Sequence, residues 1–150
     1  MVELDLVKIR KDQVERLKRF DLSNFPVCYP EMYYKMVANN PLARVCLRGE
    51  SIIASVTCRI ELNGCRKVVY IQTLAVSVLY REQGLGSRLL DFVEAVAKEN
   101  LVDFITLHVQ TSNAAAITFY QKRGFEIIET LPNYYRRIQP TSAHAMEKKL

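Results

Sequence analysis

Two long runs rich in β-branched residues, Ser51 to Leu62 and Arg66 to Val76, are separated by a short segment that contains Asn63-Gly64. An Asn-Gly pair readily adopts the positive φ angles that a tight hairpin turn requires, so the two runs are predicted to pair as a hairpin. A third strand-like run, Ala43 to Leu47, precedes them and ends at the turn Arg48-Gly49-Glu50. Together the runs predict an antiparallel meander of three strands.

Helices and further strands surround this meander. Helices are predicted where apolar residues recur at helical spacing or where caps mark the ends: Asp12 to Phe20 with Asp12 as N-cap, Glu31 to Ala38, Gly84 to Lys98, and a helix capped by Asn113 that runs to Arg123 before Gly124. Additional strands are predicted at Glu3 to Ile9, Phe104 to Val109, Phe125 to Thr130 and Ala143 to Glu147. The order predicts an α/β (α+β) fold with helices packed on a mixed, mostly antiparallel central sheet, in a single domain over residues 1–150.

The charge balance limits the classes of partner. Lys and Arg number 21 against 16 Asp and Glu, a formal net charge of +5, which favours anionic partners such as a phosphorylated cofactor, acidic peptides or a ribosome surface. The basic residues are scattered apart from Arg136-Arg137 and the C-terminal Lys148-Lys149, so we expect no direct nucleic-acid binding. Because no apolar run reaches membrane-spanning length and no signal-peptide core is present, we expect no membrane segment and a cytoplasmic location that could extend to the nucleus.

The cysteines do not predict a metal site. Cys28, Cys46, Cys58 and Cys65 form no C-x-x-C pair, and the chain has only two histidines. In a cytosolic protein we expect four free, mostly buried thiols, although Cys58 and Cys65 flank the predicted turn and could approach each other.

The segment Arg81-Glu82-Gln83-Gly84-Leu85-Gly86 lies between a predicted strand and a predicted helix and has the form R-x-x-G-x-G. Its glycines allow the backbone to approach a ligand, and the helix that follows presents its positive N-terminal end, an arrangement suited to a pyrophosphate. The segment lacks the Lys-Ser/Thr pair of a P-loop and has one glycine too few for a dinucleotide fingerprint. Taken alone, it fits a tight strand-to-helix turn equally well.

Two motifs in this order resemble those of one enzyme superfamily. The R-x-x-G-x-G segment resembles the pyrophosphate-binding signature of the GNAT acetyltransferases, and Asn113 to Phe125 resembles their N-x-x-A-x-x-F-Y-x-x-x-G-F stretch. Further segments are similar to the NatE-type (San) subfamily of N-α-acetyltransferases: Phe25-Pro26-Val27-x-Tyr29, Tyr70-Ile71-x-Thr73-Leu74, Leu107-His108-Val109-Gln110 and Asn133-Tyr134-Tyr135.

The resemblance implies the GNAT fold and an enzyme that moves acetyl from acetyl-CoA to the N-terminal amine of peptides and proteins beginning with methionine. It also implies partners of the NatA type, both auxiliary and catalytic subunits, at the ribosome. Two alternatives remain at this stage: a lysine (N-ε) acetyltransferase, and an acetyl-CoA-binding, non-catalytic subunit of an N-terminal acetyltransferase complex.

Three residues are candidates for catalysis. An α-amine has a pKa near 8, so a modest base suffices to deprotonate it. His108, at the end of an apolar strand, is the candidate base, and the resemblance implies that Tyr70 acts with it on an ordered water. The counterpart of Tyr120 in many GNAT enzymes protonates the departing thiolate, with core packing beside Phe119 as the alternative.

The resemblance also assigns two binding sets. The acetyl-CoA set comprises Leu74, Ala75, Val76, Arg81, Glu82, Gln83, Gly84, Leu85, Gly86, Ser87, Asn113, Ala116, Tyr120 and Lys122. The acceptor set comprises Phe25, Pro26, Val27, Tyr29, Gln72, Tyr134, Tyr135 and Ile138. Two positions depart from the subfamily. Gln72 stands where the subfamily carries methionine, and because its amide adds polarity, the preference for the acceptor is expected to shift. Ala75 replaces the subfamily's usual glycine, which is a mild change.

Overall fold

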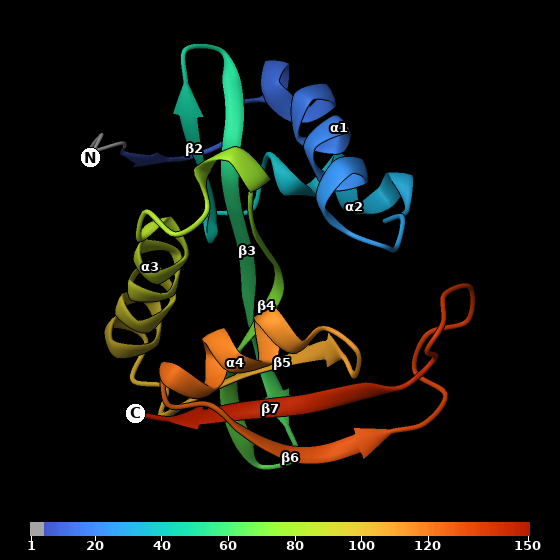
Figure 1. Cartoon of the computed structure of the whole chain (residues 1–150). Helices are drawn as coiled ribbons and strands as arrows, with labels where there is room; N and C mark the ends of the chain where they lie inside the picture. The colour runs from blue at the N-terminus through green and yellow to red at the C-terminus, as the bar shows by residue number, and fades with distance from the viewer. Residues whose placement is uncertain (1–4) are drawn as a thin grey trace. The chain divides into compact units, whose positions relative to one another are not determined.

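The computed structural model describes residues 5–150, which divide into two compact units (Figure 1). Of the described residues, the first unit comprises 5–59 and 71–93, and the second comprises 60–70 and 94–150. Hydrogen bonds join seven strands in the order β1-β2-β3-β4-β5-β7-β6. Of the predicted strand Glu3 to Ile9, only Leu6–Val7 forms β1, and Glu3 and Leu4 lie outside the described residues.

The predicted meander is present as β2 (Ala43–Arg48), β3 (Ser51–Asn63) and β4 (Arg66–Val76). Strand β2 pairs antiparallel with both β1 and β3, and the register with β3 shifts between Cys46 and Leu47. Residues 52–58 of β3 are all buried, which explains the unbroken apolar and small-residue run in the sequence. From Tyr70 to Val76 burial alternates along β4, so its half-buried side chains recur every second residue.

Helices α1 (Val14–Asn24) and α2 (Glu31–Val37) belong to the first unit and lie side by side (Figure 1). The prediction of Asp12 as N-cap is wrong. A 3-10 turn over Lys11–Gln13 precedes α1, the Arg10 N–H donates to Gln13 Oε1 at 2.9 Å, and the Asp12 carboxylate instead accepts from the Arg10 guanidinium at 3.0 Å. The α1 helix also continues four residues past Phe20, to Asn24, and ends before Pro26, which cannot donate a backbone hydrogen bond.

A buried ionisable group, the carboxyl of Asp21, joins α1 to α2. Asp21 is only 2% exposed, and its Oδ2 accepts a 2.8 Å hydrogen bond from the Tyr34 hydroxyl. Its Oδ1 has no hydrogen-bond partner among the described residues. Burial therefore raises the pKa of Asp21 from 3.8 to about 6, while the bond from Tyr34 opposes that rise.

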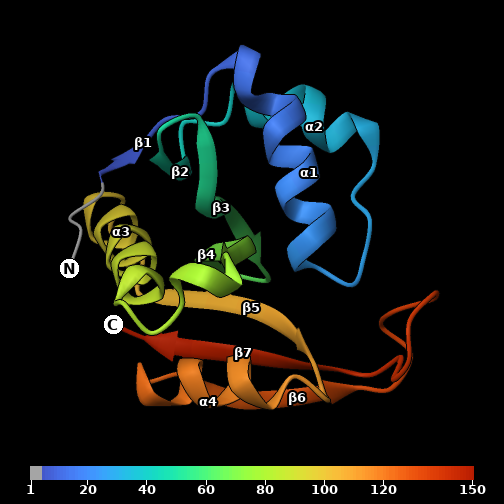
Figure 2. The ribbon, with the colours of Figure 1, turned by 45° about the horizontal axis from the view of Figure 1, so that its top comes forward.

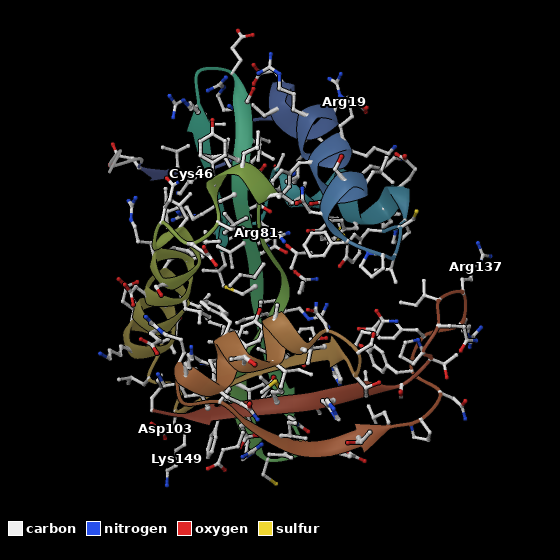
Figure 3. All side chains as sticks on the ribbon, in the orientation of Figure 1. Arg19, Cys46, Arg81, Asp103, Arg137 and Lys149 are labelled. Carbon is white, nitrogen blue, oxygen red and sulfur yellow. The ribbon has the colours of Figure 1, made fainter. Side chains whose placement is uncertain are left out.

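The second unit is built on β5 (Phe104–Gln110), β6 (Glu126–Leu131) and β7 (Ala143–Lys149). Strand β7 lies between β5 and β6 and is antiparallel to both (Figure 2). Strand β5 pairs in parallel with β4 from Val68↔Phe104 to Tyr70↔Thr106. Figure 3 labels Asp103 and Lys149 where β5 begins and β7 ends, and there the Leu150 N–H donates to the Asp103 carbonyl at 2.7 Å.

Two further helices carry the glycine segment and the GNAT stretch. Helix α3 (Leu85–Glu99) begins in the first unit and ends in the second, and helix α4 (Ala114–Lys122) belongs to the second. The Asn113 side chain accepts a 3.2 Å bond from the Ala116 N–H, as the predicted N-cap requires, and Gly124 adopts a φ of +93° where α4 ends.

Candidate active site

Tyr70 and His108 are brought into direct contact in the second unit. The parallel register places Tyr70 opposite Thr106, and His108 follows two residues later, on the same side of β5 as Thr106. The Tyr70 Oη and the His108 Nδ1 are 2.8 Å apart, within hydrogen-bond distance. Two of the three predicted catalytic side chains therefore form one pair, although 38 residues separate them in the chain.

The imidazole of His108 is enclosed by aromatic rings. The ring of Tyr134 stacks on it with centroids 4.5 Å apart and an interplanar angle of 18°, and Tyr135 packs edge-on against Tyr134 at 5.0 Å. Burial lowers the pKa of His108 below 6.5, although the charges of Glu61 and Glu129 oppose this shift. The imidazole is therefore mainly neutral near pH 7 and can accept a proton.

Tyr120 occupies a different environment. It is 7% exposed, and its ring packs edge-on between Phe119 and Phe125 at 5.2 and 5.4 Å. Burial raises its pKa far above 10, so the phenol stays protonated. The ring is therefore part of the core, and the role of its hydroxyl in catalysis stays a prediction.

The glycine segment of the first unit is exposed from Arg81 to Gly84 and opens α3. Gly84 has a φ of +85°, a Cβ at this position would meet no atom within 4 Å, and Glu82 also has a positive φ of 62°. The Arg88 N–H donates to the Gly84 carbonyl at 3.1 Å. The N–H groups of Leu85, Gly86 and Ser87 belong to the first turn of α3, where backbone donors lack partners within the helix. An open backbone of this shape fits a pyrophosphate.

The remaining positions of the acetyl-CoA set lie in strand β4 and in helix α4 with its N-cap. Leu74 and Val76 are half-buried in β4 and flank Ala75, which is 9% exposed. The Arg81 side chain, labelled in Figure 3, donates from Nε to the Val76 carbonyl at 3.0 Å. This bond ties the glycine segment to the end of β4. In the second unit, Asn113 caps α4, Ala116 is half-buried and Lys122 is exposed.

The early acceptor residues form part of an aromatic cluster in the first unit. The rings of Phe25 and Tyr29 meet edge-on at 5.8 Å, and both pack against the core of this unit. Val27 is half-buried and Pro26 is exposed. The late acceptor residues, Tyr134, Tyr135 and Ile138, lie in the loop between β6 and β7, where Figure 3 shows Arg137 at the outer end.

A groove of about 590 Å³ in the first unit contains one predicted acceptor residue, Gln72, and several that were not predicted. The side chains and backbone that line this α2 groove come from α2, the segment after it, β3 and β4: Pro30, Met32, Tyr33, Met36, Val37, Asn39, Asn40, Arg59 and Gln72. The sequence held one signal for it, because Met32 and Met36 are four residues apart on a predicted helix and both are more than 60% exposed.

Other predicted features can be placed in the described part of the chain. All four cysteines are free, but only Cys46 and Cys58 are buried, whereas Cys28 and Cys65 are exposed, which departs from the expectation of mostly buried thiols. Within residues 5–150 no group of three or more His, Cys, Asp or Glu side chains is placed to hold a metal ion. No helix in the same residues has the length and apolar character needed to cross a membrane.

The fold and both motifs agree with one protein class. The model of the Acetyltransferase (GNAT) family matches residues 11–125, and the chain belongs to this family. The predicted fold, a mixed sheet flanked by helices, is thereby confirmed, as is the prediction of an acetyltransferase.

Within the family, the chain is similar to N-terminal acetyltransferases. It is 40% identical to N-alpha-acetyltransferase 50 of Danio rerio over 98% of this chain and 89% of the relative. It is 34% identical to the probable N-acetyltransferase san of Drosophila melanogaster over 98% of this chain and 81% of the relative. A solved structure of Arabidopsis thaliana Naa50 with the bisubstrate analogue CoA-Ac-MVNAL superposes with a TM-score of 0.88 and 35% identity, over 99% of this chain and 100% of the other.

Proposed function

We propose that this chain transfers the acetyl group of acetyl-CoA to the N-terminal amine of peptides and proteins that begin with methionine. The observation that carries the proposal is the 2.8 Å contact between Tyr70 Oη and His108 Nδ1, in which burial keeps the imidazole neutral. Support comes from the relatives, which are N-α-acetyltransferases, and from the Met-Val-Asn-Ala-Leu peptide in the analogue bound to the Arabidopsis enzyme. The same relatives favour this function over lysine acetylation or a non-catalytic subunit.

The tautomer of His108 decides which nitrogen acts as the base. When Nδ1 carries the proton, it donates to Tyr70 Oη and leaves Nε2 as an acceptor. The phenol of Tyr70 then has its own proton to donate to a water, which it can position beside the amine. Because an α-amine has a pKa near 8, about a tenth of it is neutral at pH 7, and His108 need only accept the proton released on acylation.

Acetyl-CoA, when bound, supplies the activated acetyl group. The backbone of residues 82–87 would hold its pyrophosphate, since the segment is open at Gly84 and precedes the first α-helical hydrogen bond of α3. The main-chain groups of Leu74, Ala75 and Val76 would bind the pantetheine arm and stabilise charge that develops on the acetyl oxygen. The protonated phenol of Tyr120 would donate to the departing thiolate.

The aromatic loops supply the proposed contacts to methionine. Phe25 and Tyr29 offer ring faces already packed on the core, and a flexible thioether side chain contacts aromatic rings favourably. Tyr134, which stacks on His108, would bind the same peptide from the β6–β7 loop.

The finer biological setting is also a proposal. We propose that the enzyme acts as a NatE-type subunit in the cytoplasm, and in part in the nucleus, in association with NatA-type auxiliary and catalytic subunits at the ribosome. The formal net charge of +5 supports contact with an anionic ribosome surface. Co-purification of the tagged chain with ribosomes at low salt, and its loss when NatA-type subunits are depleted, would support this setting, whereas binding independent of them would contradict it.

Acetyl transfer to three short peptides tests the activity. We expect transfer from acetyl-CoA mainly to a peptide beginning Met-Leu, little to one beginning Ser-Ser, and little to acetyl-Met-Leu-Lys. Transfer only to the blocked lysine peptide would contradict the N-terminal function and would show that the enzyme acetylates lysine. Binding of acetyl-CoA without transfer to any peptide would identify a binding subunit.

A further inference from the structure

The tip of the β6–β7 loop carries two adjacent positive charges. Arg136 and Arg137 are both exposed, and no hydrogen bond or ion pair joins either of them to another residue of the described chain. The sequence has no Asp or Glu between Glu129 and Glu147, so the loop itself holds no carboxylate that could offset them. Figure 3 shows Arg137 at the outer end of the loop. The tip therefore presents two guanidinium groups that an anionic partner can bind.

Hydrogen bonds hold the base of this tip in place. The Tyr135 N–H donates to the Thr141 carbonyl at 2.8 Å, which closes the loop around residues 136–140. The Gln110 side chain, at the end of β5, donates to the Pro140 carbonyl at 2.9 Å. The tip is thus attached to β5, the strand that carries the proposed base. Because its backbone is already held, little free energy is lost in ordering it when a ligand binds.

The tip begins close to the proposed base. The ring of Tyr134 stacks on His108 with centroids 4.5 Å apart, and Arg136 follows Tyr134 by two residues. The Cα atoms of Arg136 and Arg137 are therefore at most about 7 and about 11 Å from that of Tyr134. An extended peptide advances about 3.3 Å per residue, so its third and fourth residues lie at similar distances from an amine held at His108.

The charges that act on His108 have the opposite sign. The negative charges of Glu61 and Glu129 raise the pKa of the imidazole against the effect of burial. The second unit thus has carboxylates near the proposed base and guanidinium groups at the loop tip. A peptide with a terminal ammonium followed by acidic side chains matches both regions, whereas a nucleic acid, which is negative at every phosphate, matches only the tip.

We propose that Arg136 and Arg137 determine specificity, and that they give the enzyme a preference for acceptors with acidic side chains at the third residue and beyond. The partner of the tip is then the acidic segment that follows the initiating methionine. At an exposed rim such charges mainly tune the rate of association and its salt dependence. This inference rests on the proposed function, and the test separates the two.

Acetylation rates on charged peptides test the preference. The peptides are amidated, have the forms Met-Leu-X-X-Ala-Ala and Met-Leu-Ala-Ala-X-X with Glu, Ala or Lys at both X positions, and are assayed at low salt. We expect kcat/KM for the Glu peptide to exceed that for the Lys peptide by roughly three- to tenfold in at least one form, because a single exposed ion pair contributes little and each peptide offers two. The ratio should shrink in about 0.5 M salt because screening weakens exposed pairs.

Matched double variants assign the preference to the tip. Arg136→Gln with Arg137→Gln should bring the Glu-to-Lys ratio to about one, and Arg136→Glu with Arg137→Glu should invert it. Lys98→Gln with Lys149→Gln removes the same number of exposed positive charges from the second unit, and Lys149 lies at the end of β7 remote from the loop, so this control should keep the wild-type ratio. Each ratio is internal to one variant, so a partial loss of folded protein does not distort it.

The other outcomes contradict the inference. A wild-type ratio of one, with normal transfer to the Ala peptide, overturns the inference alone, as does a ratio that survives the double Gln variant. A wild-type ratio of one together with loss of ribosome co-purification in the double Glu variant would assign the tip to an anionic ribosome surface instead. Failure of every Met-initiated peptide would reject the proposed function and this inference together.

Discussion

Replacement of the buried Asp21 by asparagine is expected to make the protein more stable at neutral pH than at acid pH, relative to wild type. The carboxylate is 2% exposed, its Oδ1 has no hydrogen-bond partner among the described residues, and its pKa rises from 3.8 to about 6. A folded-state pKa above the unfolded-state value means that the folded protein binds the proton more tightly. The associated stability is complete below pH 3.8 and is lost as the pH rises through 6.

The size of the effect follows from the shift. A change of 2.2 pKa units corresponds to about 3 kcal/mol of unfolding free energy lost by pH 7.5, of which about 1 kcal/mol is already lost at pH 4.5. The difference between Asp21→Asn and wild type should therefore grow by about 2 kcal/mol between pH 4.5 and 7.5. The hydrogen bond from Tyr34 can be retained, since an amide oxygen also accepts. The absolute offset depends on whether the new amide N–H groups find acceptors, so the pH dependence is the measured quantity.

Urea unfolding at several pH values, with matched m-values, measures this difference. Asp12→Asn is the control, because Asp12 is exposed beside Arg10 and its pKa is lowered rather than raised. Parallel stability curves for wild type and Asp21→Asn across pH 4.5 to 7.5 would refute the reasoning, because they would mean that the buried carboxylate does not titrate differently in the folded and unfolded states.

Two further predictions concern the candidate site. Gly84→Glu should weaken acetyl-CoA binding at least tenfold by calorimetry, because it places an L residue at a φ of +85° and an anionic side chain in the proposed phosphate cradle. Gly64→Glu, at a φ of +66° in the hairpin, is the control and should bind acetyl-CoA normally. Equal affinities of the two variants would contradict the cradle. His108→Ala should lower kcat on a Met-Leu peptide by about 10²-fold while acetyl-CoA still binds. The acid limb of the wild-type pH–rate profile, with a midpoint below 6.5, should disappear in this variant. An unchanged acid limb in the variant would mean that another group titrates there.

Much of the fold was predictable because local signals agreed with the tertiary structure. The Asn63-Gly64 turn and the Asn113 and Gly124 helix ends lie where the sequence places them. The start of α1 was not predictable from Asp12, because a buried Gln13, only 1% exposed, makes the bond to the Arg10 N–H and leaves Asp12 to the Arg10 side chain. Several side chains could have completed that turn, and the sequence does not say which one is buried.

The candidate site, like the fold, was predictable only in part. Family resemblance predicted that Tyr70 and His108 act together on a water, but their direct contact depends on the parallel register of β4 and β5, which no local signal specifies. The α2 groove was missed for the same reason. Tyr33, Arg59 and Gln72 come from three elements and meet only when α2 packs on the long strands.

The stacking of Tyr134 on His108 links the proposed base to the β6–β7 loop. When the imidazole is protonated, the face of the Tyr134 ring lies over a cation, and such a pair attracts rather than repels. Protonation of His108 would therefore remove the proposed proton acceptor while its contact with the Tyr134 ring remains attractive. The same acidification protonates Asp21 and relieves the cost of its buried charge, so the proposed base and the contact between α1 and α2 respond to acid in opposite ways.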